Sequence, residues 1–165
     1  MLGRLRAGPE SNRAKAGPEA MSPEPKANMR GNYSIEKMIL LNSINMSGYK
    51  GLIAYKKGFA LAMEIFHISK KFPPEEKYSL TDQIRRSSRS VCTNMAEALK
   101  RARYKKYYIN KLNDAETENG ETQVWLDFAY HCTYLNEEEY KKLSILNEEV
   151  GKLIWFMINN PDKFS

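Results

Sequence analysis

The sequence contains no apolar run that approaches the roughly 20 residues needed to cross a bilayer. Its basic N-terminus, with Arg4 and Arg6, continues into glycine, proline and glutamate where a secretion signal would have an apolar segment. We therefore expect neither a membrane-spanning helix nor a cleaved leader. These absences predict a cytoplasmic protein.

Cysteine is scarce as well, since only Cys92 and Cys132 occur among 165 residues. They lie far apart in the sequence, each inside a helical pattern, and no Cys-x-x-Cys spacing indicates a metal or redox site. We expect reduced, buried thiols. A disulfide across a helix pair is compatible with the pattern, but nothing in the sequence requires one.

Sequence signatures of catalysis are missing too: the chain has no glycine-rich phosphate loop, no zinc-finger spacing and no nucleophile elbow. Glu64 and His67 have the Glu-x-x-His spacing of di-iron bundles, and Asp127 and His131 are four residues apart. A di-iron site needs a second Glu-x-x-His pair and two further inward glutamates, and that second pair is absent. We predict no metal, no cofactor and no enzymatic activity.

Residues 1–48 differ in composition from the rest. The tetrapeptide Ala-Gly-Pro-Glu occurs twice, Pro23 and Pro25 follow, and aromatic residues are nearly absent. Such a segment buries too little apolar surface to offset the entropy lost on ordering. We expect a disordered or non-native N-terminal extension over 1–48 and a folded domain over 49–165.

After residue 50 the apolar residues follow the period of an α-helix, and no strand pattern remains. Pro73 and Pro74 mark the end of the first helix. Four helices are predicted. The first spans residues 51–72, and the second begins with a capping box at 79–82. The third spans 104–132, and the fourth runs from a capping box at Asn136 and Glu139 to residue 160. Long helices with short connections predict an all-α, antiparallel up-and-down four-helix bundle.

The predicted buried stripes recur at spacings of three and four residues. In the first helix the stripe comprises Tyr55, Phe59, Ala62, Phe66 and Ser69. In the second it comprises Leu80, Ile84, Val91, Met95, Ala98 and Ala102. In the third it comprises Tyr108, Leu112, Ala115, Asn119, Thr122, Leu126 and Ala129. In the fourth it comprises Tyr140, Leu143, Leu146, Val150, Leu153 and Met157.

The last helix has more apolar side chains than one stripe uses. Ile154, Trp155 and Ile158 lie partly off the predicted stripe. Apolar surface left over by a single core is typically covered by another subunit. We therefore expect an oligomer.

The net charge of +6 is unevenly distributed. Residues 85–111 contain nine Lys or Arg side chains and one acid, Glu97, whereas residues 114–139 contain eight acids and no Lys or Arg. A cationic strip on a helix can follow a nucleic-acid backbone through its phosphates. The predicted phosphate-binding side chains are Arg85, Arg86, Arg89, Lys100, Arg101, Arg103, Lys105 and Lys106. Nearby Tyr104, Tyr107 and Tyr108 are candidates for stacking on bases, but they would also suit the core.

Two other interpretations of the cationic strip stay open. Like-charged runs are common on solvated faces of helical bundles, where acids on neighbouring helices relieve their repulsion. Alternatively, a basic face on one subunit meets an acidic face on the next in a head-to-tail interface. The acids available for such intersubunit pairs include Glu116, Glu118, Glu121 and Glu137.

Asn94 and Glu97 form a polar pair at helical spacing, next to residues of the buried stripe. We expect them to hydrogen-bond across a helix interface, for example to Arg101 or to a neighbouring subunit. A direct contact to RNA is the functional alternative.

Residues 78–126 resemble a known family, the small four-helix-bundle proteins encoded in intervening sequences of 23S ribosomal RNA genes. The matching residues include Phe72, Pro73, Glu76, Tyr78, Ser79, Leu80, Gln83, Ile84, Arg85, Arg86, Ser90, Val91, Asn94, Met95, Ala96, Glu97, Arg101, Leu112, Ala115 and Glu121. The similarity extends over about 110 residues, from near Tyr49 to Phe164. Where the family usually has Pro-Ala-Asn, this chain has Cys-Thr-Asn at 92–94, so a straighter second helix is expected.

The resemblance implies an up-and-down bundle that assembles into a homopentameric ring, with no catalytic activity. It also implies structural roles for Asn94, Glu97 and Glu121. The family is similar in structure to the accessory variability proteins of diversity-generating retroelements. Through these relatives the resemblance implies a basic surface that binds nucleic acid and a reverse transcriptase. We therefore expect an oligomeric bundle that binds RNA or DNA non-specifically through phosphates. The alternative is a protein–protein scaffold without a nucleic-acid role.

Overall fold

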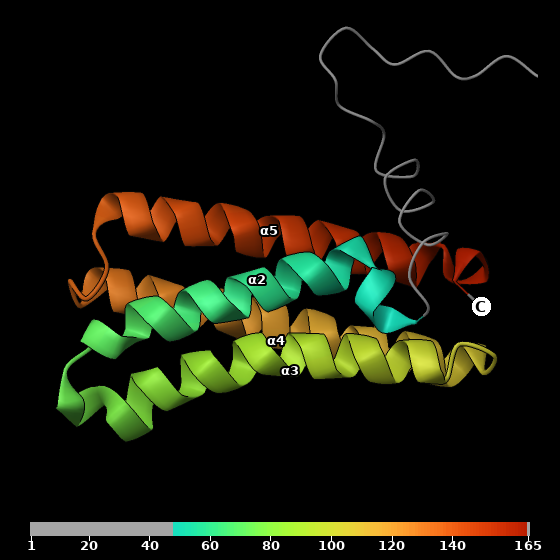
Figure 1. The fold of residues 1–165 in the computed structure, drawn as a ribbon, viewed down its shortest axis with the longest axis horizontal. Helices are drawn as coiled ribbons and strands as arrows, with labels where there is room; N and C mark the ends of the chain where they lie inside the picture. The colour runs from blue at the N-terminus through green and yellow to red at the C-terminus, as the bar shows by residue number, and fades with distance from the viewer. Residues whose placement is uncertain (1–47, 165) are drawn as a thin grey trace, which may run out of the picture. The chain divides into compact units, whose positions relative to one another are not determined.

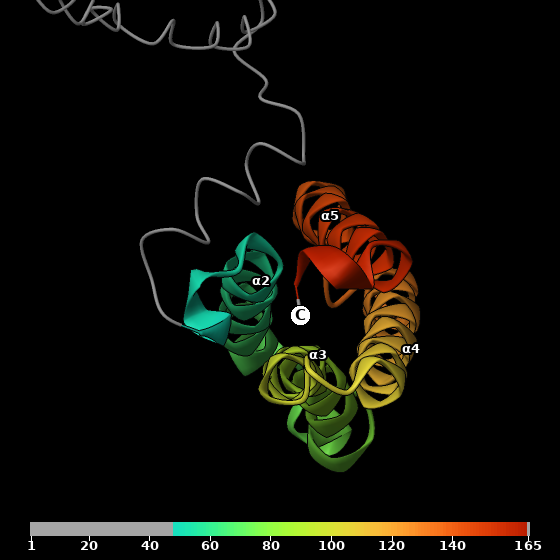
Figure 2. The same ribbon diagram turned by 90° about the vertical axis from the view of Figure 1, so that its right-hand side faces the viewer.

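The computed structural model describes residues 48–164, which contain four long helices. Figures 1 and 2 show these helices lying side by side. They are α2 (Ile53–Ile68), α3 (Asp82–Lys100), α4 (Lys105–His131) and α5 (Glu137–Asn159). Successive helices run antiparallel, and α5 packs back on α2. No strand occurs among the described residues, so the predicted all-α four-helix bundle is confirmed. The extension predicted over residues 1–48 lies outside the described residues, apart from Gly48.

The start of α3 differs from the predicted capping box at Ser79. A π-helical turn, Lys77–Thr81, precedes α3. Its N-cap is Glu76, whose carboxylate accepts hydrogen bonds from the Leu80 N–H at 3.3 Å and from the Ser79 hydroxyl. The Tyr134 hydroxyl, from the connection between α4 and α5, donates to the same carboxylate at 3.1 Å. The bond from Ser79, with those from Tyr134 and Leu80, lowers the pKa of Glu76.

The start of α5 has the predicted capping box. The side-chain oxygen of Asn136 accepts from the Glu139 N–H at 2.9 Å, and the Glu139 carboxylate accepts from the Asn136 N–H at 3.0 Å. Glu137 and Glu138 add negative charge to the first turn, where the helix dipole favours it. This end of the helix is therefore specified by its local sequence.

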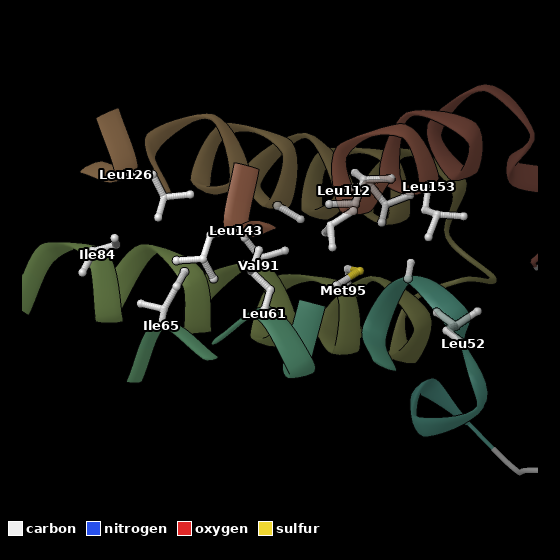
Figure 3. Close-up of a cluster of buried hydrophobic side chains, with 14 of the residues drawn as sticks. Leu52, Leu61, Ile65, Ile84, Val91, Met95, Leu112, Leu126, Leu143 and Leu153 are labelled. Atoms are coloured by element: carbon white, nitrogen blue, oxygen red, sulfur yellow. The ribbon is translucent and has the colours of Figure 1, made fainter. Parts of the chain in front are cut away.

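The buried stripes predicted for α3 and α4 are confirmed, except that Ala102 lies beyond the end of α3 and is half-buried. All seven residues predicted for α4 are buried. Figure 3 shows where Ile84, Val91 and Met95 of α3 meet the leucines of the other helices. α3 is a single unbroken α-helix from Asp82 to Lys100, and the straighter second helix expected from the sequence stays a prediction.

The buried face predicted for α2 is wrong at its three aromatic residues, whereas Ala62 and, just after the helix, Ser69 are buried as predicted. The residues that face the core are Ile53, Ala54, Gly58, Leu61, Ala62 and Ile65. Phe59 is instead 52% exposed, and Tyr55 and Phe66 are half-buried. The reason is the close approach of α2 to α3: a Cβ atom on Gly58 would lie 3.1 Å from the terminal methyl group of Met95. A small residue fits this crossing, whereas an aromatic ring does not.

In α5 the predicted stripe is confirmed at Leu143, Val150, Leu153 and Met157. Tyr140 and Leu146 are only half-buried, and Asn147 and Ile154 are buried instead. Ile154 was expected partly off the core face, and that expectation is wrong because α5 contacts both α2 and α4 and so buries a wide arc. Trp155 is 60% exposed, as the surplus of apolar residues indicates.

The two thiols have different surroundings. Cys92 is buried in α3, and this burial raises its pKa to about 11. Cys132 is exposed, so the expectation of two buried thiols is wrong there. Cys132 is the C-cap of α4, where the chain leaves the core.

We expect a thiol reagent to modify only Cys132 in the folded protein. At pH 8 the pKa of Cys92 leaves about 100-fold less thiolate than an exposed cysteine has, and the reagent must also reach it. Native wild type should therefore react once per chain. The Cys132→Ser variant should react only after denaturation, as followed by mass spectrometry. Rapid labelling of native Cys132→Ser protein would contradict the burial of Cys92.

Candidate nucleic-acid interface

The eight predicted phosphate-binding residues form two groups along the bundle. Arg85, Arg86 and Arg89, which we name the arginine group, lie in the first half of α3. Residues 100–107, named the basic elbow, form the end of α3, the connection and the start of α4; its cations are Lys100, Arg101, Arg103, Lys105 and Lys106. Arg89 and Lys100 are eleven positions apart on the helix, a rise of about 16 Å. The predicted strip is therefore interrupted.

Two members of the arginine group, Arg85 and Arg89, lie against an aromatic ring of α2. The guanidinium carbons of Arg85 and Arg89 lie 5.2 and 5.6 Å from the centre of the Phe66 ring, and the Lys70 ammonium lies 4.8 Å from it. The Arg85 Nε–H also donates to the Ser69 hydroxyl at 2.7 Å. Cation–ring contacts hold these charges in place without neutralising them. Phe66 was predicted as a core residue, and the structure gives it this surface role instead.

Arg86 is exposed on α3, and its charge acts on an acid of α4. Burial raises the pKa of Glu118 on α4, and the repulsion of Glu121 adds to this, while the charge of Arg86 opposes it. Arg86 and Glu118 do not form an ion pair within 4.0 Å. Arg86 is therefore near an acid but is left available to another ligand.

The basic elbow lies at the end of the bundle that faces the viewer in Figure 2. Tyr104 and Tyr107 are 57% and 56% exposed, whereas Tyr108 is 1% exposed. The guanidinium carbon of Arg103 lies 5.4 Å from the centre of the Tyr104 ring, and that of Arg101 lies 5.8 Å from the Tyr107 ring. Of the three tyrosines predicted to stack on bases or to fill the core, two are thus at the surface and one is in the core.

The cations of both groups are almost free of carboxylates. None of the five arginines in residues 48–164 lies within 4.0 Å of a carboxylate; the ion pairs there all use lysine. Lys105 pairs with Asp162 at 2.9 Å, and both side chains are largely exposed. Lys100 and Lys106 have no partner among the described residues. Seven of the eight predicted side chains thus have no carboxylate partner among residues 48–164.

Asn94 and Glu97 have a partner different from the predicted one. The Lys111 ammonium lies 3.1 Å from the Glu97 carboxylate and 3.2 Å from that of Asp114, and it donates to the Asn94 side-chain oxygen at 3.4 Å. These contacts, above all the one with Glu97, raise the pKa of Lys111. The polar pair joins α3 to α4 as expected, but through Lys111 and not through Arg101. Two acids, Glu97 and Asp114, thus remove one cation, Lys111, from the basic surface.

Glu121, the third predicted structural residue, is exposed on α4 and accepts a hydrogen bond from the Trp125 indole N–H at 3.0 Å. This bond lies within one helix turn. It orients the indole but does not join two helices.

A different surface lies between α4 and α5. An open groove of about 860 Å³ runs between them and includes the exposed Ile145 and Trp155. At its base, Asn119 and Asn147 each donate a side-chain N–H to the other's backbone carbonyl, at 3.2 and 3.1 Å. Asn119 was predicted as a stripe residue, whereas Asn147 was missed because its polarity does not mark a buried position.

The residues that were weighed as metal ligands have other partners. Glu64 pairs with Lys142 at 2.9 Å, and the His67 ring lies edge-on to Phe66. Asp127 accepts hydrogen bonds from Gln123 and Tyr140. Residues 48–164 contain no group of three or more His, Cys, Asp or Glu side chains placed to hold a metal ion. Over the same range, none of the helices combines the length and apolar character needed to span a bilayer.

The model of the 23S rRNA-intervening sequence protein family matches residues 50–155. The chain belongs to this family. The family member is also similar to a crystal structure from Bacteroides thetaiotaomicron, described as a protein with unknown function from the S23 ribosomal protein family. The two are 30% identical with a TM-score of 0.60, and the match covers 66% of this chain and 96% of the other. No curated protein matches.

The match confirms the predicted family and its helical fold. The function of the Bacteroides thetaiotaomicron protein is itself unknown. The relation to retroelement accessory proteins and the pentameric ring stay predictions.

Proposed function

We propose that this family member is a non-enzymatic helical bundle that binds RNA or DNA through the phosphate backbone. The observation that carries the proposal is the lack of neutralisation: of the eight predicted cations, only Lys105 has a carboxylate partner among residues 48–164. Clustered, unpaired cations attract a polyanion and release its counterions. Phosphate contacts position a nucleic acid without reading its sequence, so the binding is non-specific.

We also propose that the bundle works as a homopentameric ring and that its partner in the cell is a nucleoprotein. Support for assembly comes from exposed apolar side chains on α4 and α5, among them Phe128, Ile145 and Trp155. The nucleoprotein that we propose contains a reverse transcriptase. This part of the proposal rests on the resemblance to retroelement accessory proteins alone.

The test compares two pairs of charge-removing substitutions. Arg86→Gln with Arg89→Gln removes two unpaired charges from the arginine group, and the slope of log affinity against log salt should fall by about one per arginine. Lys141→Gln with Lys152→Gln removes the same charge from α5, which lies diagonally across from α3 in Figure 2. This control pair should leave the slope unchanged. Fluorescence anisotropy with a structured RNA at increasing salt measures both.

Wild-type protein that fails to bind RNA at low salt contradicts the proposal. Binding that does not weaken with salt contradicts it as well, since each neutralised phosphate contributes roughly 0.7 to 0.9 to the slope. Equal effects of the two substitution pairs would assign binding to net charge and not to the arginine group.

A second candidate function is a protein–protein scaffold, favoured by the apolar groove between α4 and α5 beside exposed acids such as Glu116 and Glu148. In that case the arginines of one subunit pair with acids of the next. The same Arg86→Gln, Arg89→Gln variant separates the candidates in light scattering. Dissociation of the assembly supports the scaffold, and an intact assembly with weakened RNA binding supports the nucleic-acid function.

A further inference from the structure

The basic elbow contains two exposed tyrosines whose rings meet edge to face. The ring centres of Tyr104 and Tyr107 lie 6.4 Å apart, and the ring planes are almost perpendicular, at 87°. Arg103 lies over the Tyr104 ring and Arg101 over the Tyr107 ring. Each ring is more than half exposed, so ring surface remains for a ligand. The elbow thus offers two aromatic surfaces that face different directions, each beside a guanidinium group.

The elbow is held firmly by the core beneath it. Tyr108 is buried and its ring stacks on that of Phe164, with centres 6.5 Å apart and planes 23° from parallel. The Tyr104 N–H donates to the carbonyl of Arg101 at 2.8 Å, and the Tyr108 N–H donates to that of Tyr104 at 3.0 Å. The backbone that carries the two exposed rings is therefore fixed before any ligand arrives, which reduces the entropy lost on binding.

Perpendicular rings match some nucleic acids and not others. In a duplex the bases are stacked parallel to one another and their faces are covered, so two crossed rings cannot stack on neighbouring bases. In an unpaired strand each base can turn independently and can lie on an aromatic ring while cations contact the backbone. The ring geometry therefore favours unpaired nucleotides over a duplex.

The arginine group lacks this capacity. The ring of Phe66 is half-buried and is approached by three cations within 6 Å: Lys70, Arg85 and Arg89. Little of that ring is left for a base, so the arginine group offers charge without a stacking surface. The two basic groups of the bundle thus differ in chemistry.

We propose that the basic elbow binds an unpaired segment of nucleic acid, with one base on Tyr104, one on Tyr107, and phosphates on Arg101, Arg103 and Lys106. The inference rests on the proposed function and adds the substrate class: single strands or the unpaired parts of a folded RNA. The arginine group then contacts backbone of any form. Deletion of the rings should weaken single-strand binding selectively.

The experiment uses the full chain with three labelled probes, which are an oligouridine, an oligothymidine and a blunt RNA duplex. The double variant Tyr104→Ala, Tyr107→Ala should bind the single strands about 5- to 150-fold more weakly per ring removed and the duplex as wild type does. Phenylalanine at both positions should restore binding because the stacking surface is kept. A loss confined to one single strand assigns the site to RNA or to DNA and supports it in either case.

Tyr78 supplies a matched control. It is 79% exposed, and the Lys77 ammonium lies 5.0 Å from its ring centre, but it lies at the α2–α3 connection, at the opposite end of α3. Tyr78→Ala should leave binding of all three probes unchanged. It removes an exposed ring beside a cation, as the test variant does, without touching the elbow.

Two outcomes overturn the inference while leaving the proposed function in place. One is salt-dependent wild-type binding that the double alanine variant retains on single strands. The other is an equal loss on single strands and on the duplex, which would make the rings a general part of the cationic surface. Wild-type protein that binds none of the probes at low salt overturns both the inference and the proposed function.

Discussion

Replacement of Asn147 by aspartate is expected to lower the free energy of unfolding by about 3–5 kcal/mol, because it leaves an unpaired charge in the core. Asn147 is 3% exposed, and its side-chain N–H groups donate to the Asn119 carbonyl at 3.1 Å and to the Gln123 side-chain oxygen at 3.3 Å. A carboxylate has no proton to donate, so both acceptors would face the oxygen that replaces the amide nitrogen. Urea unfolding followed by circular dichroism measures the loss.

The destabilisation should depend on pH. Burial raises the pKa of the introduced carboxyl group above that of the unfolded chain, about 3.9. Below that pH both states are protonated and the charge penalty is absent; as the pH rises, only the unfolded state ionises freely and the stability falls. The variant should therefore be nearer to wild type at pH 4 than at pH 7.

Asn113 provides the control for this substitution. It lies on α4 like Asn119, but its side chain is exposed. Asn113→Asp makes the same chemical change and should shift the free energy of unfolding by no more than about 0.5 kcal/mol. If the two variants unfold at the same urea concentration, the buried amide pair between α4 and α5 does not stabilise the bundle.

Tyr108→Ala is the second large effect, with an expected loss of about 3–5 kcal/mol in the free energy of unfolding. The side chain is 1% exposed and packs on Phe164, so its removal leaves a cavity at the end of the core. The neighbouring Tyr107→Ala should change stability by no more than about 0.5 kcal/mol, because that ring is 56% exposed. Thermal or urea unfolding of the two variants measures the difference. Similar losses would contradict the assignment of one ring to the core and one to the surface.

Tyr108→Phe separates packing from polarity. The Tyr108 hydroxyl is buried and has no hydrogen-bond partner among the described residues, so its removal should be neutral or stabilising. Burial also raises the pKa of Tyr108. Above pH about 10 the unfolded tyrosine loses its proton while the folded one keeps it, so wild type should lose stability as the pH rises. The Tyr108→Phe variant should lose less stability than wild type over this pH range. If Tyr108→Phe is markedly less stable than wild type at neutral pH, the Tyr108 hydroxyl has a hydrogen-bond partner and the prediction is wrong.

The fold and the α4 stripe could be predicted because helix geometry is local. Residues three and four apart share a face whatever surrounds the helix, and all seven residues predicted for α4 are buried, including Asn119 and Thr122. The capping box at Asn136 and Glu139 depends on residues three positions apart, and it was predicted for the same reason. α2 was different, because its aromatic and aliphatic residues offered two competing stripes. Only the close crossing at Gly58 selected between them.

The candidate site could be predicted only as a set of charges. The sequence indicates which residues are cationic, but neutralisation depends on partners that are remote along the chain. Asp162 reaches Lys105 from 57 residues away, and Tyr134 reaches Glu76 from 58 residues away. The three tyrosines after Arg103 are equivalent in the sequence. In the structure, packing at the end of the bundle buries Tyr108 and leaves Tyr104 and Tyr107 exposed.

By itself the sequence determined that this chain forms four amphipathic helices, where most of them begin and end, and that positive charge concentrates between residues 85 and 111. These properties follow from local periodicity, capping and composition. The tertiary structure alone decided which face of α2 is buried, that the cations fall into two groups, and that the five arginines of residues 48–164 form no ion pair with a carboxylate of that range. Those properties depend on helices that meet in space, and no local pattern encodes the distance between them.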